Sequence, residues 1–118
     1  MTEARIKFPL GKQDYQAPAD AASITCAIWN TKTKVFMPAA QAMTLKLQAD
    51  PELMDGSEVE VEIVQGGTAR NITLSSSGAS TLVGPNLAGA INKTEGIVFT
   101  WDATNKKFVA DKTAWKSL

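Results

Sequence analysis

The stretch that decides the fold is GSEVEVEIVQGGTARNITL, residues 56–74. Between residues 58 and 63, glutamates alternate with Val59, Val61 and Ile63. A period of two places the apolar side chains on one face and the acidic ones on the other, which predicts a β-strand rather than an amphipathic helix. Gly66 and Gly67 permit a tight turn, and the residues up to Leu74 resume an extended pattern. We therefore predict an antiparallel hairpin that pairs Val59–Ile63 with Asn71–Leu74.

Similar patterns flank this stretch on both sides. Ile24–Trp29 and Val35–Met37 are joined by a polar turn and predict a second hairpin, while Met43–Leu47 predicts a half-buried strand. Near the C-terminus, Gly96–Trp101 and Lys106–Ala110 predict a third hairpin, whose turn suits Asp and Asn because their side chains bond the local backbone. The strands alternate with short turns. The sequence shows no repeat with a period of 20 to 50 residues, so it does not indicate a solenoid.

Two further segments lack clear strand patterns. Pro38–Ala42 predicts a short helical turn with proline at its start. Residues 75–95 are rich in small side chains and predict a long loop with short extended pieces, which we interpret as either a contact surface or a wrapped excursion. The fold class predicted from all segments is all-β, as an antiparallel β-sandwich or small barrel.

The first 22 residues read as an extended arm before a single β domain that spans residues 23–118. Pro9, Gly11 and Pro18 interrupt the arm, but Ile6, Phe8 and Leu10 alternate. Such a pattern is typical of an edge strand, on its own domain or on a neighbour's. A tail packed on its own core fits the same residues.

Composition excludes several function classes. The 12 basic residues balance the 12 acidic ones, so no basic footprint for nucleic acid or for a membrane surface is expected. The chain has no histidine and a single cysteine, Cys26. It therefore lacks the commonest general base and the ligands of a zinc site, and we expect neither a cofactor, a metal ion nor an enzyme activity. A lone Cys26 among apolar neighbours predicts a buried thiol in a protein made in a reducing cytoplasm.

The residues that we predict to contact partners are of two kinds. Glu58, Glu60 and Glu62 form either a solvated face or an acidic stripe for a basic partner, with Lys46 and Arg70 as candidate internal partners. Tryptophans more often close a core or anchor an interface than stack on sugars. The full candidate interface set is Phe8, Tyr15, Trp29, Glu58, Glu60, Glu62 and Trp115.

Residues 56–111 resemble a module of tailed-phage virion proteins, especially tail-fibre, head-fibre and decoration proteins. The resemblance rests on Asp55-Gly56, an alternating strand that ends in Val-Gln-Gly-Gly-Thr68, the short strand Arg70–Leu74, and a strand that ends in Trp101-Asp102. An aromatic-rich loop common in that family is replaced here by Ser75–Ala79.

The resemblance implies a virion structural protein, often trimeric, and implies no catalytic residues. It favours an auxiliary capsid or decoration protein, or a head-fibre base, located in the virion. Its expected partners are the major capsid protein or other virion proteins, bound through the arm, and further copies of itself. A receptor- or carbohydrate-binding tail-fibre module is the alternative.

Overall fold

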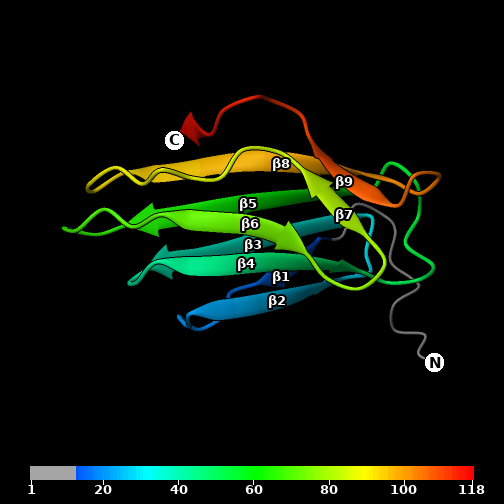
Figure 1. The fold of residues 1–118 in the computed structure, drawn as a ribbon, viewed down its shortest axis with the longest axis horizontal. Helices are drawn as coiled ribbons and strands as arrows, with labels where there is room; N and C mark the ends of the chain where they lie inside the picture. The colour runs from blue at the N-terminus through cyan, green and yellow to red at the C-terminus, as the bar shows by residue number, and fades with distance from the viewer. Residues whose placement is uncertain (1–12) are drawn as a thin grey trace.

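The protein is described by a computed structural model over residues 13–118, which form β-strands and no helix. Seven strands make a mixed sheet, sheet A, in the order β1-β3-β5-β8-β9-β7 with β10 beside β8, and three make sheet B, in the order β2-β4-β6 (Figure 1). No helix in this part of the chain is long and apolar enough to cross a membrane. The strands are β1 (Asp14–Gln16), β2 (Ser23–Ile28), β3 (Lys32–Ala39), β4 (Met43–Ala49), β5 (Glu58–Gln65), β6 (Ile72–Ser76), β7 (Thr81–Val83), β8 (Thr94–Asp102), β9 (Lys107–Ala110) and β10 (Lys116–Ser117).

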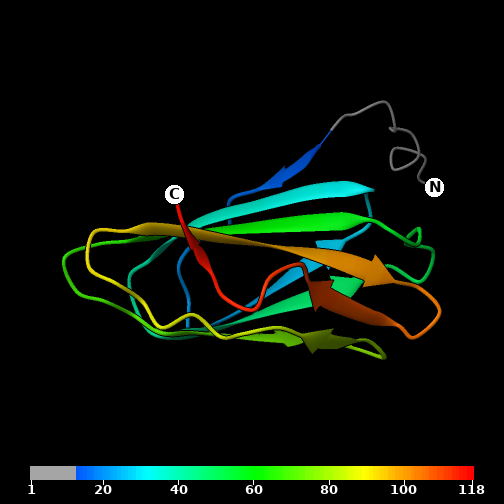
Figure 2. The ribbon, with the colours of Figure 1, turned by 90° about the horizontal axis from the view of Figure 1, so that it is seen from above.

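From β1 to β6 the chain winds between the two sheets. Odd-numbered strands lie in sheet A and even-numbered strands in sheet B, and each pairs in parallel with the strand two places along (Figure 2). A parallel pair needs a crossover connection, and here the crossover is a strand of the opposite sheet. This winding needs no sequence repeat, so the missing period in the sequence did not exclude a coiled path.

The winding corrects two predicted hairpins and the antiparallel pairing. β2 and β3 lie in different sheets, as do β5 and β6, so their connections cross between layers. Among residues 13–118, antiparallel pairing is confined to the neighbours of β8, which are β5, β9 and β10, and to a bridge between Ile72 and Leu87. The predicted strands are present. The two strands of each of these predicted hairpins, however, face each other across the core instead of lying side by side in one sheet.

The inward faces of both sheets belong to one hydrophobic cluster. The alternation in β5 is reproduced in the structure, because Val59, Val61 and Ile63 are completely buried while the glutamates between them face outward. β2 and β4 show the same alternation of buried and exposed side chains. The remaining members lie on β3, β6, β8 and β9 and in two loops, and include Val35, Met37, Leu53, Ile72, Leu87, Phe99, Trp101 and Phe108.

The third predicted hairpin is confirmed. β8 and β9 pair antiparallel, with Trp101 opposite Phe108 and their rings 4.6 Å apart between centroids. The carboxylate of Asp102 accepts hydrogen bonds from the N–H groups of Thr104 and Asn105 and from the Asn105 side chain. These bonds, led by the one from the Asn105 side chain, lower the pKa of Asp102. The local bonding expected of an Asp in this turn therefore forms.

The predicted helical turn at Pro38–Ala42 is wrong, because Pro38 and Ala39 are the last residues of β3. The Glu58 N–H donates to the Thr31 carbonyl, so odd-numbered residues of β3 direct their backbone groups toward β5. Pro38 is even-numbered, so its nitrogen points away from β5, toward the edge of β3 that β1 pairs with. The short strand β1 ends before it reaches Pro38. A proline is tolerated in a strand at such an edge position, since no hydrogen bond is lost there.

Part of the predicted arm belongs to sheet A. Asp14–Gln16, which form β1, pair in parallel with β3. This part of the arm is therefore an edge strand on its own domain. The alternating residues Ile6, Phe8 and Leu10 lie outside the described residues.

The predicted loop 75–95 covers one edge of sheet B. Ile72 and Leu87 exchange two backbone hydrogen bonds of 2.9 Å, and the Leu74 N–H donates to Asn86 Oδ1. The loop also contains β7 and ends as β8 begins. Residues 84–90 therefore close the edge of β6 instead of extending freely from the surface.

The connection from β5 to β6 is closed by a buried side chain. Gln65 is 3% exposed, its Nε2 donates to the Arg70 carbonyl, and its Oε1 accepts the Arg70 N–H, both at 2.9 Å. This pair of bonds replaces the backbone ladder that a hairpin would have supplied. Gly89 packs directly against Gln65 and Arg70.

Candidate interaction surface

The outward side of sheet A gathers the predicted acidic residues. β3, β5 and β8 lie side by side, and the register places Lys32 opposite Glu58, Lys34 opposite Glu60 and Glu60 opposite Val98. Tyr15 of β1 pairs with Lys34 and is 58% exposed. We refer to these outward side chains as the sheet A face, which consists of Tyr15, Lys32, Lys34, Glu58, Glu60, Glu62 and Val98.

Two of the three glutamates are paired with lysines of β3. Lys32 Nζ lies 3.4 Å from Glu58 Oε1, and Lys34 Nζ lies 3.5 Å from Glu62 Oε2. The second pair is the less exposed, with side chains 26% and 14% exposed, so water screens it less. The predicted partners Lys46 and Arg70 are wrong for these two glutamates, since Lys46 lies on β4 of the opposite sheet.

Glu60 differs from its two neighbours. It forms no ion pair with any residue of the described part of the chain. It borders two hollows: one of about 80 Å³ with Lys32, Glu58 and Val98, and one of about 280 Å³ toward the C-terminal tail. A carboxylate between two hollows can receive a cationic side chain from a partner without losing an internal bond.

The C-terminal tail forms the wall of the larger hollow. The Asp111 N–H donates to the Val98 carbonyl, the Leu118 N–H donates to the Thr94 carbonyl, and β10 pairs with β8. The indole of Trp115 donates to the Pro85 carbonyl at 3.0 Å, which holds the tail against the loop after β7. Leu118 is 58% exposed beside Gly96, so the rim of this hollow carries an apolar side chain.

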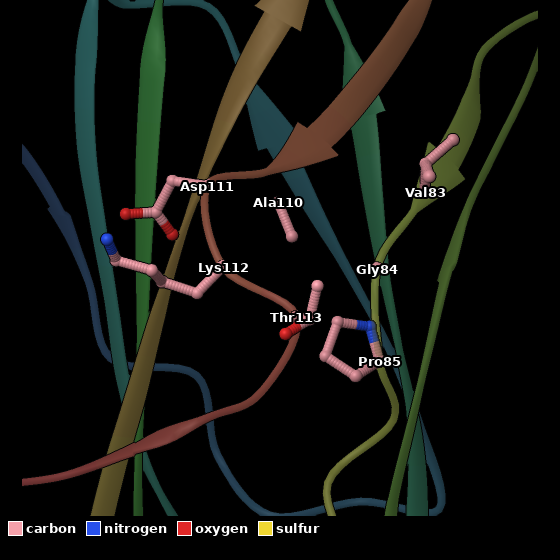
Figure 3. A pocket seen from close by; sticks show the side chains of 7 residues that line it. All are labelled: Val83, Gly84, Pro85, Ala110, Asp111, Lys112 and Thr113. Atoms are coloured by element: carbon pink, nitrogen blue, oxygen red, sulfur yellow. The ribbon is translucent and has the colours of Figure 1, made fainter.

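A third hollow, of about 590 Å³, opens between the segment that follows β7 and the segment that follows β9 (Figure 3). Val83, Gly84 and Pro85 line one side, and Ala110–Thr113 line the other. Asp111 and Lys112 point toward β8, whereas Thr113 lies beside Pro85 (Figure 3). Gly84 has no room for a side chain, because an added Cβ would lie 2.8 Å from the Phe99 ring. The hollow therefore has an apolar floor, and its charged residues point away from it.

The structure brings together four of the seven predicted interface residues. Tyr15, Glu58, Glu60 and Glu62 share the sheet A face. Trp29 is half-buried after β2, Trp115 is half-buried and bonded to Pro85, and Phe8 lies outside the described residues.

Sequence reasoning missed Lys32 and Lys34, which were assigned to a polar turn. The signal that could have found them is the alternation of the two lysines with Thr33 and Val35, which is typical of a strand. In the parallel register these lysines lie beside the glutamates of β5.

Cys26 is not placed for nucleophilic chemistry. Its side chain is 2% exposed, and burial, with a smaller contribution from the negative charge of Asp14, raises the pKa of the thiol from its ordinary 9.0 to about 11. The thiol therefore stays protonated and shielded at neutral pH. Within residues 13–118, no three Asp, Glu or Cys side chains lie close enough to hold a metal ion.

This thiol predicts a specific alkaline sensitivity. Below about pH 9 the thiol is protonated in both states, but between about pH 9 and 11 only the unfolded chain releases the proton. The free energy of unfolding should therefore fall through this window, by about 3 kcal/mol at most for a two-unit shift. Urea unfolding of the native protein and of Cys26→Ala from pH 8 to 11 measures this loss. The Cys26→Ala variant keeps every other titratable group of the protein. If the free energy of unfolding depended on pH equally in the two proteins, the assignment to Cys26 would be contradicted.

No protein-family model matches the sequence, and no curated protein matches it significantly.

Proposed function

We propose that this chain is a non-enzymatic structural protein of a phage virion, either an auxiliary capsid or decoration protein or the base of a head fibre. It binds the major capsid protein or another virion protein, and it associates with further copies of itself, with a trimer favoured. The virion setting is supported by the resemblance of residues 56–111 to virion modules. The non-enzymatic role is supported by the absence of histidine and by the shielded Cys26 thiol.

The observation that carries the proposal is the sheet A face. It combines exposed Tyr15, two lysine–glutamate pairs and the Glu60 carboxylate, which forms no ion pair within residues 13–118 and lies between two hollows. An aromatic side chain beside charges that are already matched suits a protein interface, where aromatic anchors give affinity and charges fix the register. The two sheets are further proposed to act as one sandwich, because their inward side chains form a single cluster.

The direct experiment measures the mass of the purified protein by analytical ultracentrifugation, alone and mixed with phage heads assembled without it. Self-association together with co-sedimentation on the heads supports the proposal. A strict monomer without affinity for the heads would overturn it. Specific binding to a glycan array, without binding to heads, would favour a carbohydrate-binding tail module instead.

Reversing the charge of Glu60 tests the sheet A face. We expect Glu60→Lys to weaken self-association or head binding by at least ~10-fold, because a partner cation would then face a like charge. Stability should change by about 1 kcal/mol or less, since the Glu60 side chain is half-buried but points away from the core. The matched control is Lys46→Glu on the outward side of sheet B. Equal binding losses in the two variants would show a non-specific charge effect and contradict the assignment.

A further inference from the structure

The edge of β8 that faces away from β5 is covered by the chain that follows it. Even-numbered residues of β8 direct their backbone groups to this edge, since the Val98 carbonyl accepts the Asp111 N–H. β9 pairs with the C-terminal half of β8, and β10 pairs with its N-terminal half at Glu95 and Gly96. On this edge β9 and β10 are therefore two parts of one interrupted strand.

The interruption between β9 and β10 is a bulge. Phe99 of β8 pairs with Ala110 of β9. An unbroken ladder would place Gly96 opposite Thr113, because each is three residues further along the ladder. Gly96 pairs with Lys116 instead. The chain between the two strands therefore carries three residues more than the ladder needs, and these residues bulge from the edge.

Residues 115–118, which we call the closing segment, are held by contacts with earlier parts of the chain. The Trp115 indole N–H donates to the Pro85 carbonyl at 3.0 Å, and the Leu118 N–H donates to a β8 carbonyl at 2.8 Å. The Leu118 side chain packs against Gly96, where an added Cβ would lie 3.1 Å from Leu118 Cδ1. These contacts join the closing segment to a surface that every copy of the chain presents in the same form.

The connection from β9 to the closing segment is short and exposed. After Asp111, residues 112–114 lead the chain away from β8 toward Pro85, and β10 returns to β8 (Figure 2). Short connections favour exchange of the segment that follows them, because an opened chain need not fold back on itself. An exchanged closing segment would make the same contacts on another copy, so the main cost of exchange is that of bringing two copies together.

Detaching the closing segment would open little of the core. Trp115 is partly buried against the core, whereas Lys116, Ser117 and Leu118 are exposed. The edge of β8 left behind would accept another strand, because unpaired strand edges pair readily with other chains. Glu60 lines the same hollow as Lys116, so its charge attracts an incoming segment that carries this lysine.

We propose that this edge of β8 is a strand-acceptor site, and that the closing segment of a second copy occupies it in exchange for the chain's own. The inference rests on the self-association proposed above and deepens it by naming the segment that passes between copies. Reciprocal exchange joins two copies, and passage around a closed ring joins three. The exchange does not depend on the virion setting.

Disulfide trapping in the full-length protein tests the exchange. Glu95 pairs with Ser117, and neighbouring strands bring Cα atoms within the separation that a disulfide accepts. We expect a mixture of Glu95→Cys chains and Ser117→Cys chains to form linked heterodimers under mild oxidation. A mixture of Glu95→Cys and Lys116→Cys chains is the matched control, because successive residues of a strand point to opposite faces. The control should give at least ~10-fold fewer heterodimers.

One chain that carries both Glu95→Cys and Ser117→Cys shows whether the pair can link at all. Glu95 Oε1 is buried without a hydrogen-bond partner in the described part of the chain, so losing this carboxylate should not disrupt the fold. Linking in this double variant, without excess heterodimers in the mixture, would overturn the exchange. No linking in the double variant would overturn the pairing of the closing segment itself. Sedimentation of the native protein measures self-association separately, so copies that associate without exchange would leave the sheet A face as their contact.

Discussion

Replacing Gly89 with alanine is expected to destabilise the protein by about 3–5 kcal/mol. The added Cβ would overlap the Arg70 carbonyl oxygen and lie 2.5 Å from Gln65 Nε2. Overpacking costs about 1–3 kcal/mol, and displacing Gln65 would also break its two hydrogen bonds to Arg70 in a buried position. Because a domain has about 5–15 kcal/mol of stability in total, the variant should be marginally folded.

The matched controls for Gly89 lie in the connection that Gln65 closes. An added Cβ at Gly66 or Gly67 would meet no atom within 4 Å, and neither residue has a positive φ. Gly66→Ala and Gly67→Ala should therefore change the free energy of unfolding by less than about 1 kcal/mol. Urea unfolding followed by tryptophan fluorescence compares the three variants. A Gly89→Ala protein as stable as these controls would show that the backbone around Arg70 yields easily.

Phe108→Ala is expected to cost about 3–5 kcal/mol, the usual range for removing a buried aromatic side chain. Phe108 is completely buried on β9, and its ring packs against Trp101. The substitution would leave a cavity between the β8–β9 hairpin and the rest of the core. Tryptophan fluorescence, to which Trp101 contributes, should shift toward that of a water-exposed indole at a lower urea concentration than in the native protein.

Val109→Ala on the same strand is the control for Phe108. Val109 is only partly buried and lies outside the core cluster, so its truncation should cost less than about 1 kcal/mol. Both variants change one side chain of the four-residue strand β9 and keep its backbone bonds. Similar losses in both would indicate that β9 contributes through its strand pairing and not through the Phe108 ring.

The strands and their inward faces could be predicted from the sequence, but most of their partners could not. Alternation identifies a half-buried strand, and it did so for Val59–Ile63 and Met43–Leu47. The same pattern arises whether the next strand lies beside it or across the core, so two connections between sheets were interpreted as hairpins. For Gly66–Asn71 the deciding contacts come from the Gln65 side chain, which local turn preferences do not reveal.

The candidate surface was predicted in part for the same reason. The outward direction of Glu58, Glu60 and Glu62 followed from the period of two in β5. Their partners depended on the parallel register between β3 and β5, which places Lys32 and Lys34 beside them. Tyr15 joined this face only because β1 adds to β3. Pairing over long sequence separations therefore controls the composition of the surface.

The winding of β1 to β6 has a consequence for how the protein can fold during synthesis. Each strand from β3 to β6 pairs with one made 19 to 29 residues earlier, since Tyr15 pairs with Lys34 and Met43 with Ile72. A growing chain can therefore add each new strand to an edge that has already left the ribosome, and it need not wait for the C-terminus. The β8–β9 hairpin then completes sheet A by pairing with β5. Contacts of moderate sequence separation replace the very long ones that slow many β proteins.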